Sequence, residues 1–277
     1  MFAASDTRQQ ALCFRHRKAK PVHAGVDVDR AVAFPSGLQA IDIPFGELAG
    51  IGACGVLVTS DLHALTAAKA AVAIDFSTHD ILPEVARACA EAKTALVSGT
   101  TGLLAEGLLA LQEASELVPV LWEPNMSVGV QVLARLVQRA IELLGLGFDV
   151  EVSETHHRLK VDAPSGTAKR LAEDAKQARG DRDAFVTGRD GKPGRRPDRE
   201  IGVFAMRGGD VIGDHTVHLL GQGERIELTH RATSRDLFAS GALRAAQWIA
   251  HKSPGRYTLA DVLLDPPPTK DAEMILE

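Results

Sequence analysis

The sequence predicts an α/β fold in two parts, a parallel sheet covered by helices and an α+β part with a mixed or antiparallel sheet. Across residues 21–120, short apolar runs of strand length alternate with amphipathic segments of helical spacing, the rhythm of parallel βαβ units. From residue 201 the pattern changes to successive strand-like segments, with a glycine-containing hairpin turn at 221–224. These two patterns separate the halves of the chain.

The first part is expected to contain strands at 22–28, 71–76, 94–97 and 118–122. Helices are expected between them at 80–92 and 104–117, where alanine, leucine and glutamate recur at helical spacing. A further amphipathic helix over 235–252 has an apolar stripe suited to packing back onto this first part.

Three of these strands end at the edge where ligands of open parallel sheets bind. Phe76 and Ser77 end one strand, a GTTG turn occupies 99–102, and Glu123, Pro124, Asn125 and Met126 follow the next. Glycine permits close approach of a ligand to the backbone, and Ser and Thr hydroxyls bond ribose or phosphate oxygens. The edge formed by these loops is a candidate nucleotide site.

The second part is expected to begin near residue 126 with a long helix over 128–144. Phe148, Val150 and Val152 alternate with polar residues, which predicts a strand with one buried face, and a helix is expected over 167–179. Strands are expected at 202–206, 211–220 and 225–232. Residues 181–200 are polar and rich in Gly and Pro, which predicts an exposed loop, available to cover a site.

The most chemically dense stretch is ETHHRLKVDAPSGT, residues 154–167, between this strand and the following helix. Ser165, Gly166 and Thr167 place the positive end of a helix close to Lys160, an arrangement suited to a carboxylate. His156 and His157 add imidazoles, which donate protons near neutral pH. The stretch predicts an anion site with a proton donor.

Composition limits the classes of partner. A net charge of −5 gives no electrostatic reason to expect nucleic acid, and no apolar run reaches the length of a signal peptide or a membrane span. Cys13, Cys54 and Cys89 are odd in number and widely spaced, which favours free thiols in a reducing compartment. We therefore expect a cytoplasmic protein without membrane or nucleic-acid contacts.

Four sequence motifs resemble those of the dihydrodipicolinate reductase (4-hydroxy-tetrahydrodipicolinate reductase) family. They are the run at 154–167, GTTG at 99–102, RGGD at 207–210 and HRATSR at 230–235. The likeness extends from about residue 46 to residue 264, and the fourteen-residue run is its most specific part. The resemblance implies a Rossmann-type domain over 1–125 and 236–277, and a substrate-binding and oligomerisation domain over 126–235.

The resemblance also implies an activity, a cofactor and residue roles. It implies NADH- or NADPH-dependent reduction of a cyclic dicarboxylate in diaminopimelate and lysine biosynthesis by a homotetramer. His156 matches the family's proton donor, Lys160 its cationic partner, His157 a substrate contact, and the run from Ser165 to Thr167 the carboxylate-binding helix start. The implied cofactor contacts are Phe76, Gly99, Thr100, Thr101, Glu123, Pro124, Asn125 and Met126.

The beginning of the chain departs from the family pattern. Dinucleotide sites open with a glycine-rich turn, whereas this chain has no glycine before Gly25 and has Ala4 and Asp6 near the expected turn. Asp27 stands where an acidic residue would bond the adenosine ribose, which favours NADH, although Arg30 is suited to a phosphate. Glu123 replaces a residue that is usually small and apolar, which is tolerated if only its backbone meets the nicotinamide.

Two alternatives remain at this point. The altered start leaves open a non-catalytic homologue that keeps the dicarboxylate pocket but has lost dinucleotide binding. A metal hydrolase is the weaker alternative, because the candidate ligands lack the paired spacing typical of zinc sites and we expect no metal. Those candidates are Glu154, His156, His157, His215, His218 and His230.

Overall fold

The computed structural model describes residues 2–4, 12–13, 59 and 61–265, and the chain divides into two compact units. Unit 1 contains Met1–Met126 and Asp236–Glu277, and unit 2 contains Ser127–Arg235. The chain therefore leaves unit 1 once, builds unit 2 from one continuous segment, and returns at Asp236.

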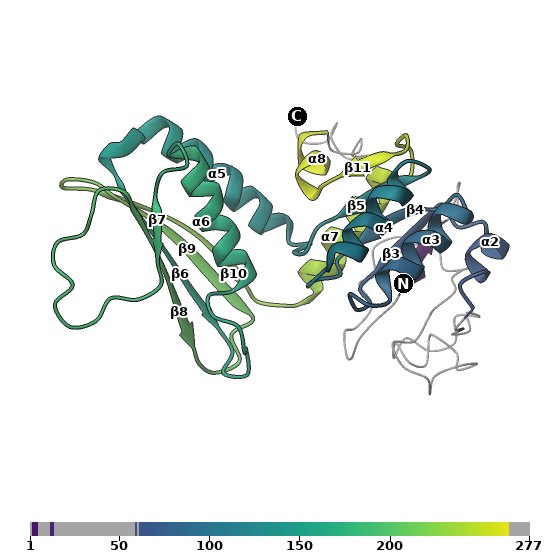
Figure 1. Ribbon diagram of the computed structural model, residues 1–277, viewed down its shortest axis with the longest axis horizontal. Helices are drawn as coiled ribbons and strands as arrows, with labels where there is room; N and C mark the ends of the chain where they lie inside the picture. The colour runs from purple at the N-terminus through teal and green to yellow at the C-terminus, as the bar shows by residue number, and fades with distance from the viewer. Residues whose placement is uncertain (1, 5–11, 14–58, 60, 266–277) are drawn as a thin grey trace, which may run out of the picture. The chain divides into compact units, whose positions relative to one another are not determined.

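The sheet of unit 1 has the order β1-β3-β4-β5-β11 in the described residues, and β2 also pairs with β3 (Figure 1). All its pairings are parallel except that of β1 with β3. The predicted strands at 71–76, 94–97 and 118–122 are confirmed, whereas the one at 22–28 lies outside the described residues. The strands are β1 Phe2–Ala4, β2 Leu12–Cys13, β3 Val72–Asp75, β4 Ala95–Ser98, β5 Pro119–Trp122 and β11 Gly255–Tyr257.

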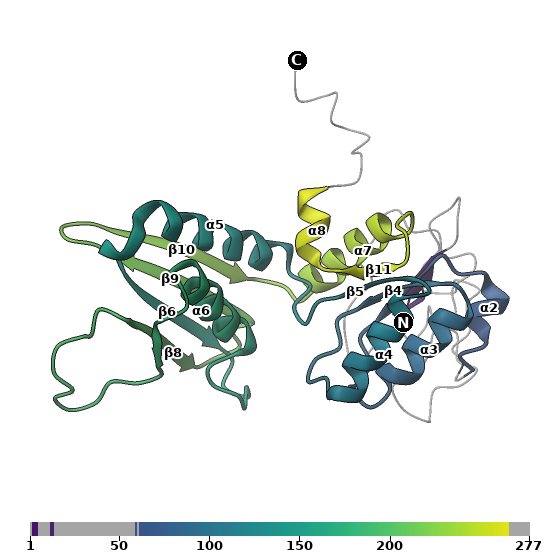
Figure 2. The same cartoon turned by 45° about the horizontal axis from the view of Figure 1, so that its top comes forward.

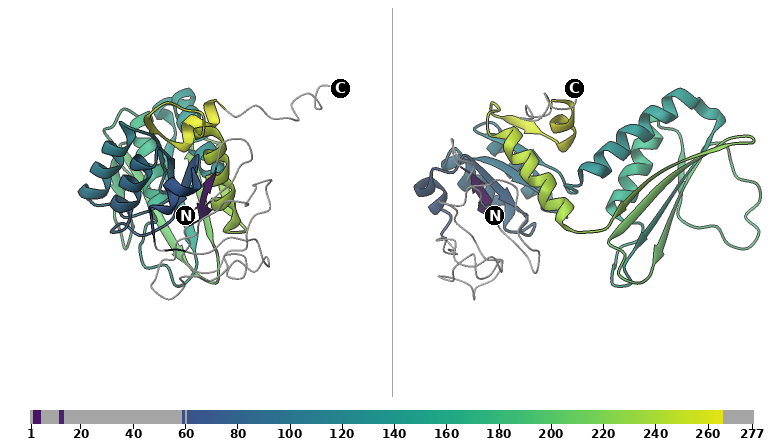
Figure 3. Two further views of the ribbon diagram at one scale, coloured as in Figure 1. Left: turned by 90° about the vertical axis from the view of Figure 1, so that its right-hand side faces the viewer. Right: turned by 180° about the vertical axis from the view of Figure 1, so that it is seen from behind.

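Helices cover both faces of this sheet, as the βαβ pattern predicts. Helices α3 (Leu82–Glu91) and α4 (Ala105–Ser115) lie together on one face, and α7 (Asp236–Ile249) lies on the other (Figures 1 and 3). Every residue of β3 and β4 is buried, as expected for strands covered on both sides. The short helices α2 (Ala64–Ala68) and α8 (Leu259–Leu264) complete the described part of unit 1.

The spacing of apolar residues in α3 explains how it packs. Leu82, Val85, Ala86 and Cys89 are fully buried and recur at intervals of three, one and three residues, which places them on one helical stripe. They join a core cluster with the interior of β4 and α4. Cys89 is a free thiol, and burial raises its pKa well above the usual range.

Unit 2 is a mixed sheet with two helices on one face (Figure 2). Its strand order is β10-β9-β6-β8-β7, in which β6, β8 and β7 run parallel while β9 runs antiparallel to β6 and β10. Helices α5 (Val128–Leu144) and α6 (Gly166–Ala178) pack on each other and on the strands. The strands are β6 Asp149–His156, β7 Ala184–Val186, β8 Glu200–Arg207, β9 Gly213–Leu220 and β10 Arg225–Ala232.

Strand β6 is the centre of unit 2, and its burial alternates residue by residue. Val150, Val152, Glu154 and His156 are buried on the face that the helices cover, and the residues between them lie on the other face. The predicted alternation is therefore confirmed, and it continues two steps further than the apolar residues show. The buried face of β6 begins with two valines and ends with a carboxylate and an imidazole.

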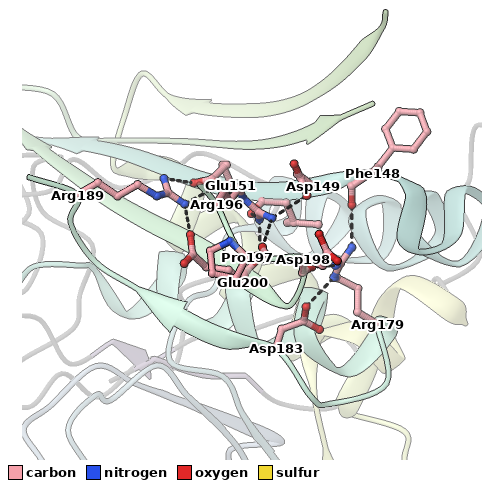
Figure 4. Close-up of polar contacts among 11 residues, drawn as sticks. Phe148, Asp149, Glu151, Arg179, Asp183, Arg189, Arg196, Pro197, Asp198 and Glu200 are labelled. Atoms are coloured by element: carbon pink, nitrogen blue, oxygen red, sulfur yellow. Dashed lines mark hydrogen bonds and ion pairs between the residues drawn. The ribbon is translucent and has the colours of Figure 1, made fainter. Parts of the chain in front are cut away.

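The loop at 187–199 is held against unit 2 by two arginines (Figure 4). Arg189 donates to Glu151 at 2.8 Å and also to Glu200. Arg196 donates to Glu151 at 2.9 Å and to Asp149 at 2.6 Å. The predicted exposure of 181–200 is confirmed for most of the segment, but a continuous loop was wrong because Ala184–Val186 pairs with β8. Three residues among charged neighbours give too short a pattern to predict a strand.

None of the helices in the described ranges has the length and apolar character required to cross a lipid bilayer.

Candidate active site in the second unit

The site of unit 2 is built around the carboxylate of Glu154. Glu154 and His156 are two residues apart on β6, so their side chains project from the same face. His156 Nδ1 lies 2.6 Å from Glu154 Oε2. Both residues are buried, with 1% of Glu154 and 8% of His156 exposed, so the carboxylate has little competition from water for the imidazole.

Two other elements, β8 and the start of α6, contribute to this carboxylate. Arg207, the last residue of β8, donates from Nη1 to Oε2 at 2.8 Å and from Nη2 to Oε1 at 2.9 Å. The backbone N–H of Ser165 donates to Oε1 at 2.9 Å. Burial alone would raise the pKa of Glu154, but the hydrogen bonds from Arg207, His156 and Ser165 outweigh it and lower that pKa. Glu154 is therefore an anion at neutral pH.

Helix α6 begins beside this carboxylate. Ser165 is its N-cap, and Ser165 Oγ accepts a hydrogen bond from the backbone N–H of Ala168 at 3.2 Å, as the predicted helix start requires. Gly166 is exposed, and no atom beyond its chain neighbours and the backbone of its own helix lies within 4 Å of the place where a side chain would project. Thr167 follows in the first turn and is half-buried. The positive end of the α6 dipole is thus open at Gly166.

Lys160 lies at the exposed margin of the same cluster. Its ammonium pairs with Asp162 Oδ1 at 2.7 Å, and the backbone carbonyl of Asp162 accepts from Arg207 Nη2 at 2.6 Å. The backbone N–H of Lys160 donates to the carbonyl of His157 at 3.1 Å, which closes a tight turn after β6. The loop therefore brings Lys160 to the residues that hold Glu154, and His157, half-buried, begins that turn.

A second imidazole, that of His215 on β9, packs against His156. The ring centroids are 5.1 Å apart and the planes meet at 77°, an edge-on contact. His215 Nε2 lies 3.2 Å from Ser165 Oγ. Burial lowers the pKa of His215 to about 4, and the positive charges of His156 and Lys160 add to that effect while Glu154 opposes it. His215 is therefore neutral at pH 7.

The lowered pKa of His215 predicts a loss of stability in acid. In the unfolded chain this histidine is protonated below its ordinary pKa of 6.5. In the folded protein it is protonated only when the pH falls to its lowered pKa of about 4. The stabilising contribution is thus complete above pH 6.5 and is lost as the pH falls towards 4. We expect the free energy of unfolding to fall by about 2 kcal/mol more in the wild type than in His215→Gln between pH 7 and pH 5.

Urea denaturation of both proteins at the two pH values measures this difference. An equal loss in the two proteins would show that His215 does not resist protonation.

The loops at the carboxyl edge of the first sheet are braced by a buried aspartate. Asp75 ends β3 and is fully buried, and its Oδ2 accepts from Ser98 Oγ at 2.8 Å and from Thr100 Oγ1 at 2.7 Å. Its Oδ1 accepts from the backbone N–H of Ser77 at 2.9 Å. The Thr100 carbonyl also accepts from Trp122 Nε1 at 2.9 Å. Thr100, expected to offer its hydroxyl to a ligand, is 2% exposed and instead holds the loop.

Gly99 and Gly102 shape the rest of this loop. A side chain at Gly99 would place its Cβ 2.3 Å from the ring of Phe76, so glycine is required there for the loop to lie against that ring. Gly102 has a φ of +70°, which favours glycine, and Thr101 beside it is exposed. Thr101 and Gly102 are thus the parts of the GTTG turn that solvent reaches.

The residues of the segment after β5 differ in burial. Glu123 is 2% exposed, and its backbone N–H donates to the carbonyl of Ser98 at 3.0 Å. Pro124 is exposed, Asn125 is half-buried and Met126 is buried. Gly241 of α7 makes room for this segment, because a Cβ there would lie 1.8 Å from the Met126 carbonyl oxygen. Asp27 and almost all of the glycine-poor start lie outside the described residues.

Sequence reasoning recognised the histidines but missed what arranges them. The roles of Arg207 and His215 depend on register: His156 pairs with Arg207 across β6 and β8, and Glu154 pairs with His215 across β6 and β9. Only the two-residue spacing of Glu154 and His156 gave a signal in the sequence. Within the described ranges, no three His, Cys, Asp or Glu side chains are grouped to hold a metal ion.

Comparison with known proteins identifies the family. The model described as "Dihydrodipicolinate reductase, N-terminus" matches residues 20–126, and "Dihydrodipicolinate reductase, C-terminus" matches residues 129–263. The chain belongs to the dihydrodipicolinate reductase family. Its relatives in this family include the 4-hydroxy-tetrahydrodipicolinate reductase of Myxococcus xanthus (strain DK1622), 52% identical over 246 residues, or 88% of this chain and 86% of that protein.

Two further proteins extend the comparison. The 4-hydroxy-tetrahydrodipicolinate reductase of Anaeromyxobacter dehalogenans (strain 2CP-1 / ATCC BAA-258) is 50% identical over 230 residues, which cover 82% of this chain and 85% of that protein. Among solved structures, a dipicolinate-bound dihydrodipicolinate reductase from Paenisporosarcina sp. TG-14 matches with a TM-score of 0.65 and 24% identity. The match covers 83% of this chain and 88% of the Paenisporosarcina chain, which supports the assignment of the dihydrodipicolinate reductase fold.

Proposed function

We propose that this chain reduces 4-hydroxy-tetrahydrodipicolinate with NADH or NADPH, and that His156 is the proton donor. The activity is that of the family, whose members with about half of their residues identical to this chain are 4-hydroxy-tetrahydrodipicolinate reductases. The reaction belongs to diaminopimelate and lysine biosynthesis. The observation that carries the assignment of the site is the buried pair of His156 and Glu154, 2.6 Å apart, beside the start of α6.

A carboxylate of the substrate fits the positive groups of unit 2. We assign one carboxylate to the start of α6, where Ser165, Gly166 and Thr167 present a helix N-terminus, and to the ammonium of Lys160. His157 lies in the same turn and is assigned as a further substrate contact. Dipicolinate, the ligand of the Paenisporosarcina relative, is a ring with the same two carboxylates, which supports this assignment.

The cofactor is assigned to the loops of unit 1. These loops fit a dinucleotide because parallel strands end there, Gly99 has no room for a side chain, and Thr101 and Gly102 are exposed. We assign the contacts to Phe76, Gly99, Thr101, Asp27 and the backbone of residues 123–126, with Thr100 bracing the loop. When bound, the dinucleotide supplies the hydride. The buried side chain of Glu123 agrees with a contact through its backbone alone.

The chain's own residues then orient the ring and move one proton. The helix start and Lys160 hold one carboxylate and so fix the ring relative to His156. His156 gives a proton to the ring as negative charge builds on it, which lowers the barrier of the reduction. The anionic Glu154 holds the donor imidazole throughout.

We assign cofactor binding and substrate binding to different parts of the chain. Residues 1–125 and 236–277 are assigned as the dinucleotide-binding domain, and residues 126–235 as the substrate-binding and oligomerisation domain. We propose a homotetramer, as in the family, and its mass in solution tests this. The proposed location is the cytoplasm, because the reaction consumes a reduced dinucleotide and Cys89 is a free thiol.

Replacing Lys160 with alanine is expected to weaken substrate binding as well as rate. The change removes a charge-assisted contact of about 1.5–3 kcal/mol, so the KM for the substrate should rise roughly 10- to 100-fold. Steady-state kinetics with varied substrate measure the change. Lys169→Ala, which removes an exposed lysine from α6, serves as the control with an unchanged KM. An unchanged KM in Lys160→Ala would remove Lys160 from the carboxylate site.

The activity itself is tested by following NADH and NADPH oxidation with freshly generated substrate. Oxidation that depends on substrate supports the proposal. The alternative of a non-catalytic homologue finds no support in the comparisons, and it predicts binding of pyridine-2,6-dicarboxylate without oxidation of either dinucleotide. That outcome would overturn the proposed function.

A further inference from the structure

We propose that Glu154 is a positioning residue, which fixes the hydrogen-bearing nitrogen of His156 as Nδ1 and so reserves Nε2 for proton transfer to the substrate. The proposal rests on the proposed function and names the device that makes His156 an effective donor. It concerns a residue that does not itself touch the reacting ring.

The contact between Glu154 and His156 determines which ring nitrogen carries hydrogen. A carboxylate offers acceptors only, so His156 Nδ1, 2.6 Å from Glu154 Oε2, must donate. The lowered pKa of Glu154 keeps that group a carboxylate in the folded protein. The neutral imidazole is therefore the Nδ1–H tautomer, and Nε2 carries a hydrogen only when the ring is an imidazolium.

The carboxylate is itself immobilised on every side. Oε1 accepts from Arg207 Nη2 and from the backbone N–H of Ser165, and Oε2 accepts from Arg207 Nη1 and from His156. Arg207 is anchored in turn by the carbonyls of Met206 and Asp162, both at 2.6 Å. Three elements of unit 2, namely β6, β8 and the start of α6, thus meet at one carboxylate, and the plane of the imidazole follows from them.

The surroundings of Nε2 are kept clear. A Cβ at Gly213 would lie only 2.9 Å from His156 Nε2, so glycine at this position leaves that nitrogen space for a reacting partner. His215 packs edge-on against the ring and is neutral at pH 7, so it adds no second positive charge to the imidazolium. Glu154 and Gly213 therefore act on the two nitrogens of one ring in different ways.

The proton balance agrees with this arrangement. The imidazolium of His156 breaks its Nε2–H bond, the proton forms a new bond to the ring that has accepted the hydride, and the electron pair stays on Nε2. The product is the neutral Nδ1–H imidazole, the tautomer that Glu154 binds, so neither ring rotation nor a proton shift follows the transfer. A proton from water then restores Nε2–H for the next turnover.

The tautomer is measured directly by ¹⁵N NMR of histidine-labelled wild-type protein, at a pH where the ring is neutral. We expect the His156 signals to show Nδ1 protonated and Nε2 bare. Assignment uses the loss of those signals in His156→Gln. A neutral ring protonated on Nε2 in the wild type would overturn the proposal without any variant of Glu154.

Glu154→Gln tests the effect on turnover. Each oxygen of Glu154 accepts a hydrogen bond from Arg207, so the NH₂ of a glutamine amide would face a guanidinium N–H in either orientation. The neutral glutamine therefore no longer imposes the Nδ1–H tautomer on His156. We expect kcat to fall on the order of 10- to 100-fold, part of the contribution of a proton donor, while the KM changes less than about threefold. The Nε2–H tautomer is expected to become populated in the same variant.

The matched control is Glu227→Gln. Glu227 also pairs with a histidine of this sheet, His218, at 3.3 Å, but it is largely exposed. We expect its kcat and the His156 signals to match the wild type. If Glu154→Gln does not fold, the double variant Glu154→Gln/Arg207→Met is measured in its place. The second substitution removes the guanidinium N–H groups that would face the glutamine NH₂.

The outcomes separate the two proposals. An unchanged kcat and an unchanged Nδ1–H tautomer in a folded Glu154→Gln protein would overturn the positioning role while the reductase activity stands. A wild-type protein that shows the Nδ1–H tautomer but oxidises neither dinucleotide would overturn the proposed function. It would also remove the role of Glu154 in that reaction, but the hydrogen bond by which Glu154 sets the tautomer of His156 would stand.

Discussion

His156→Gln is expected to lower kcat on the order of a hundredfold or more, the contribution of one well-placed proton donor. Glutamine occupies a similar volume and can still hydrogen-bond Glu154, but it cannot deliver a proton near neutral pH. Because glutamine keeps the volume and the hydrogen bond to Glu154, we expect the variant to fold with little loss of stability. The measurement is kcat from dinucleotide oxidation at saturating substrate, with circular dichroism to confirm folding.

His218→Gln is the matched control for this experiment. His218 lies on β9, next to β6, and hydrogen-bonds Ser153 at 2.9 Å on the face opposite His156. We expect its kcat to stay close to that of the wild type. Turnover in His156→Gln equal to that of the control would mean that another group provides the proton.

Arg179→Met is expected to cause the largest loss of stability in unit 2. Arg179 pairs with Asp183 at 3.1 Å and donates to the carbonyls of Phe148 at 2.7 Å and Asp198 at 3.2 Å (Figure 4). The side chains of Arg179 and Asp183 are 1% and 0% exposed. Removing the guanidinium leaves a buried carboxylate without its main partner, which costs about 3–5 kcal/mol. Urea denaturation measures the free energy of unfolding.

Arg139→Ala provides the comparison for an exposed ion pair. Arg139 and Glu142 pair at 3.0 Å on α5, with side chains 67% and 53% exposed. We expect this variant to lose no more than about 0.5 kcal/mol, since solvent screens such pairs. If the two arginine variants were equally stable, burial of the Arg179 pair would not matter for unit 2.

Regular patterns in the sequence predicted most of the described fold. Helix α5 begins and ends at the predicted residues, because a long apolar stripe between Ser127 and Gly145 has clear caps at both ends. Strands β7 and β11 were missed because each has only three residues, too few for alternation to stand out. Their places depend on pairing with β8 and β5, which no local pattern specifies.

The candidate site was predictable where chemistry is local and not where it depends on register. The histidines, Lys160 and the start of α6 lie within fourteen residues, so the sequence alone indicated a carboxylate site with a proton donor. Arg207 and His215 reach the site because β8 and β9 flank β6, and no local pattern specifies that pairing. The Thr100 hydroxyl was expected to contact a ligand, but in the structure it donates to the buried carboxylate of Asp75.

A crystal structure of the protein with pyridine-2,6-dicarboxylate tests the central claim most directly. The claim is that the start of α6 and Lys160 bind a ring dicarboxylate and orient it towards His156. We predict one carboxylate at the amides of Gly166 and Thr167 and near the ammonium of Lys160, with His156 Nε2 facing the ring. A dicarboxylate bound away from α6, or a His156 ring that turns Nε2 away from it, would contradict the account.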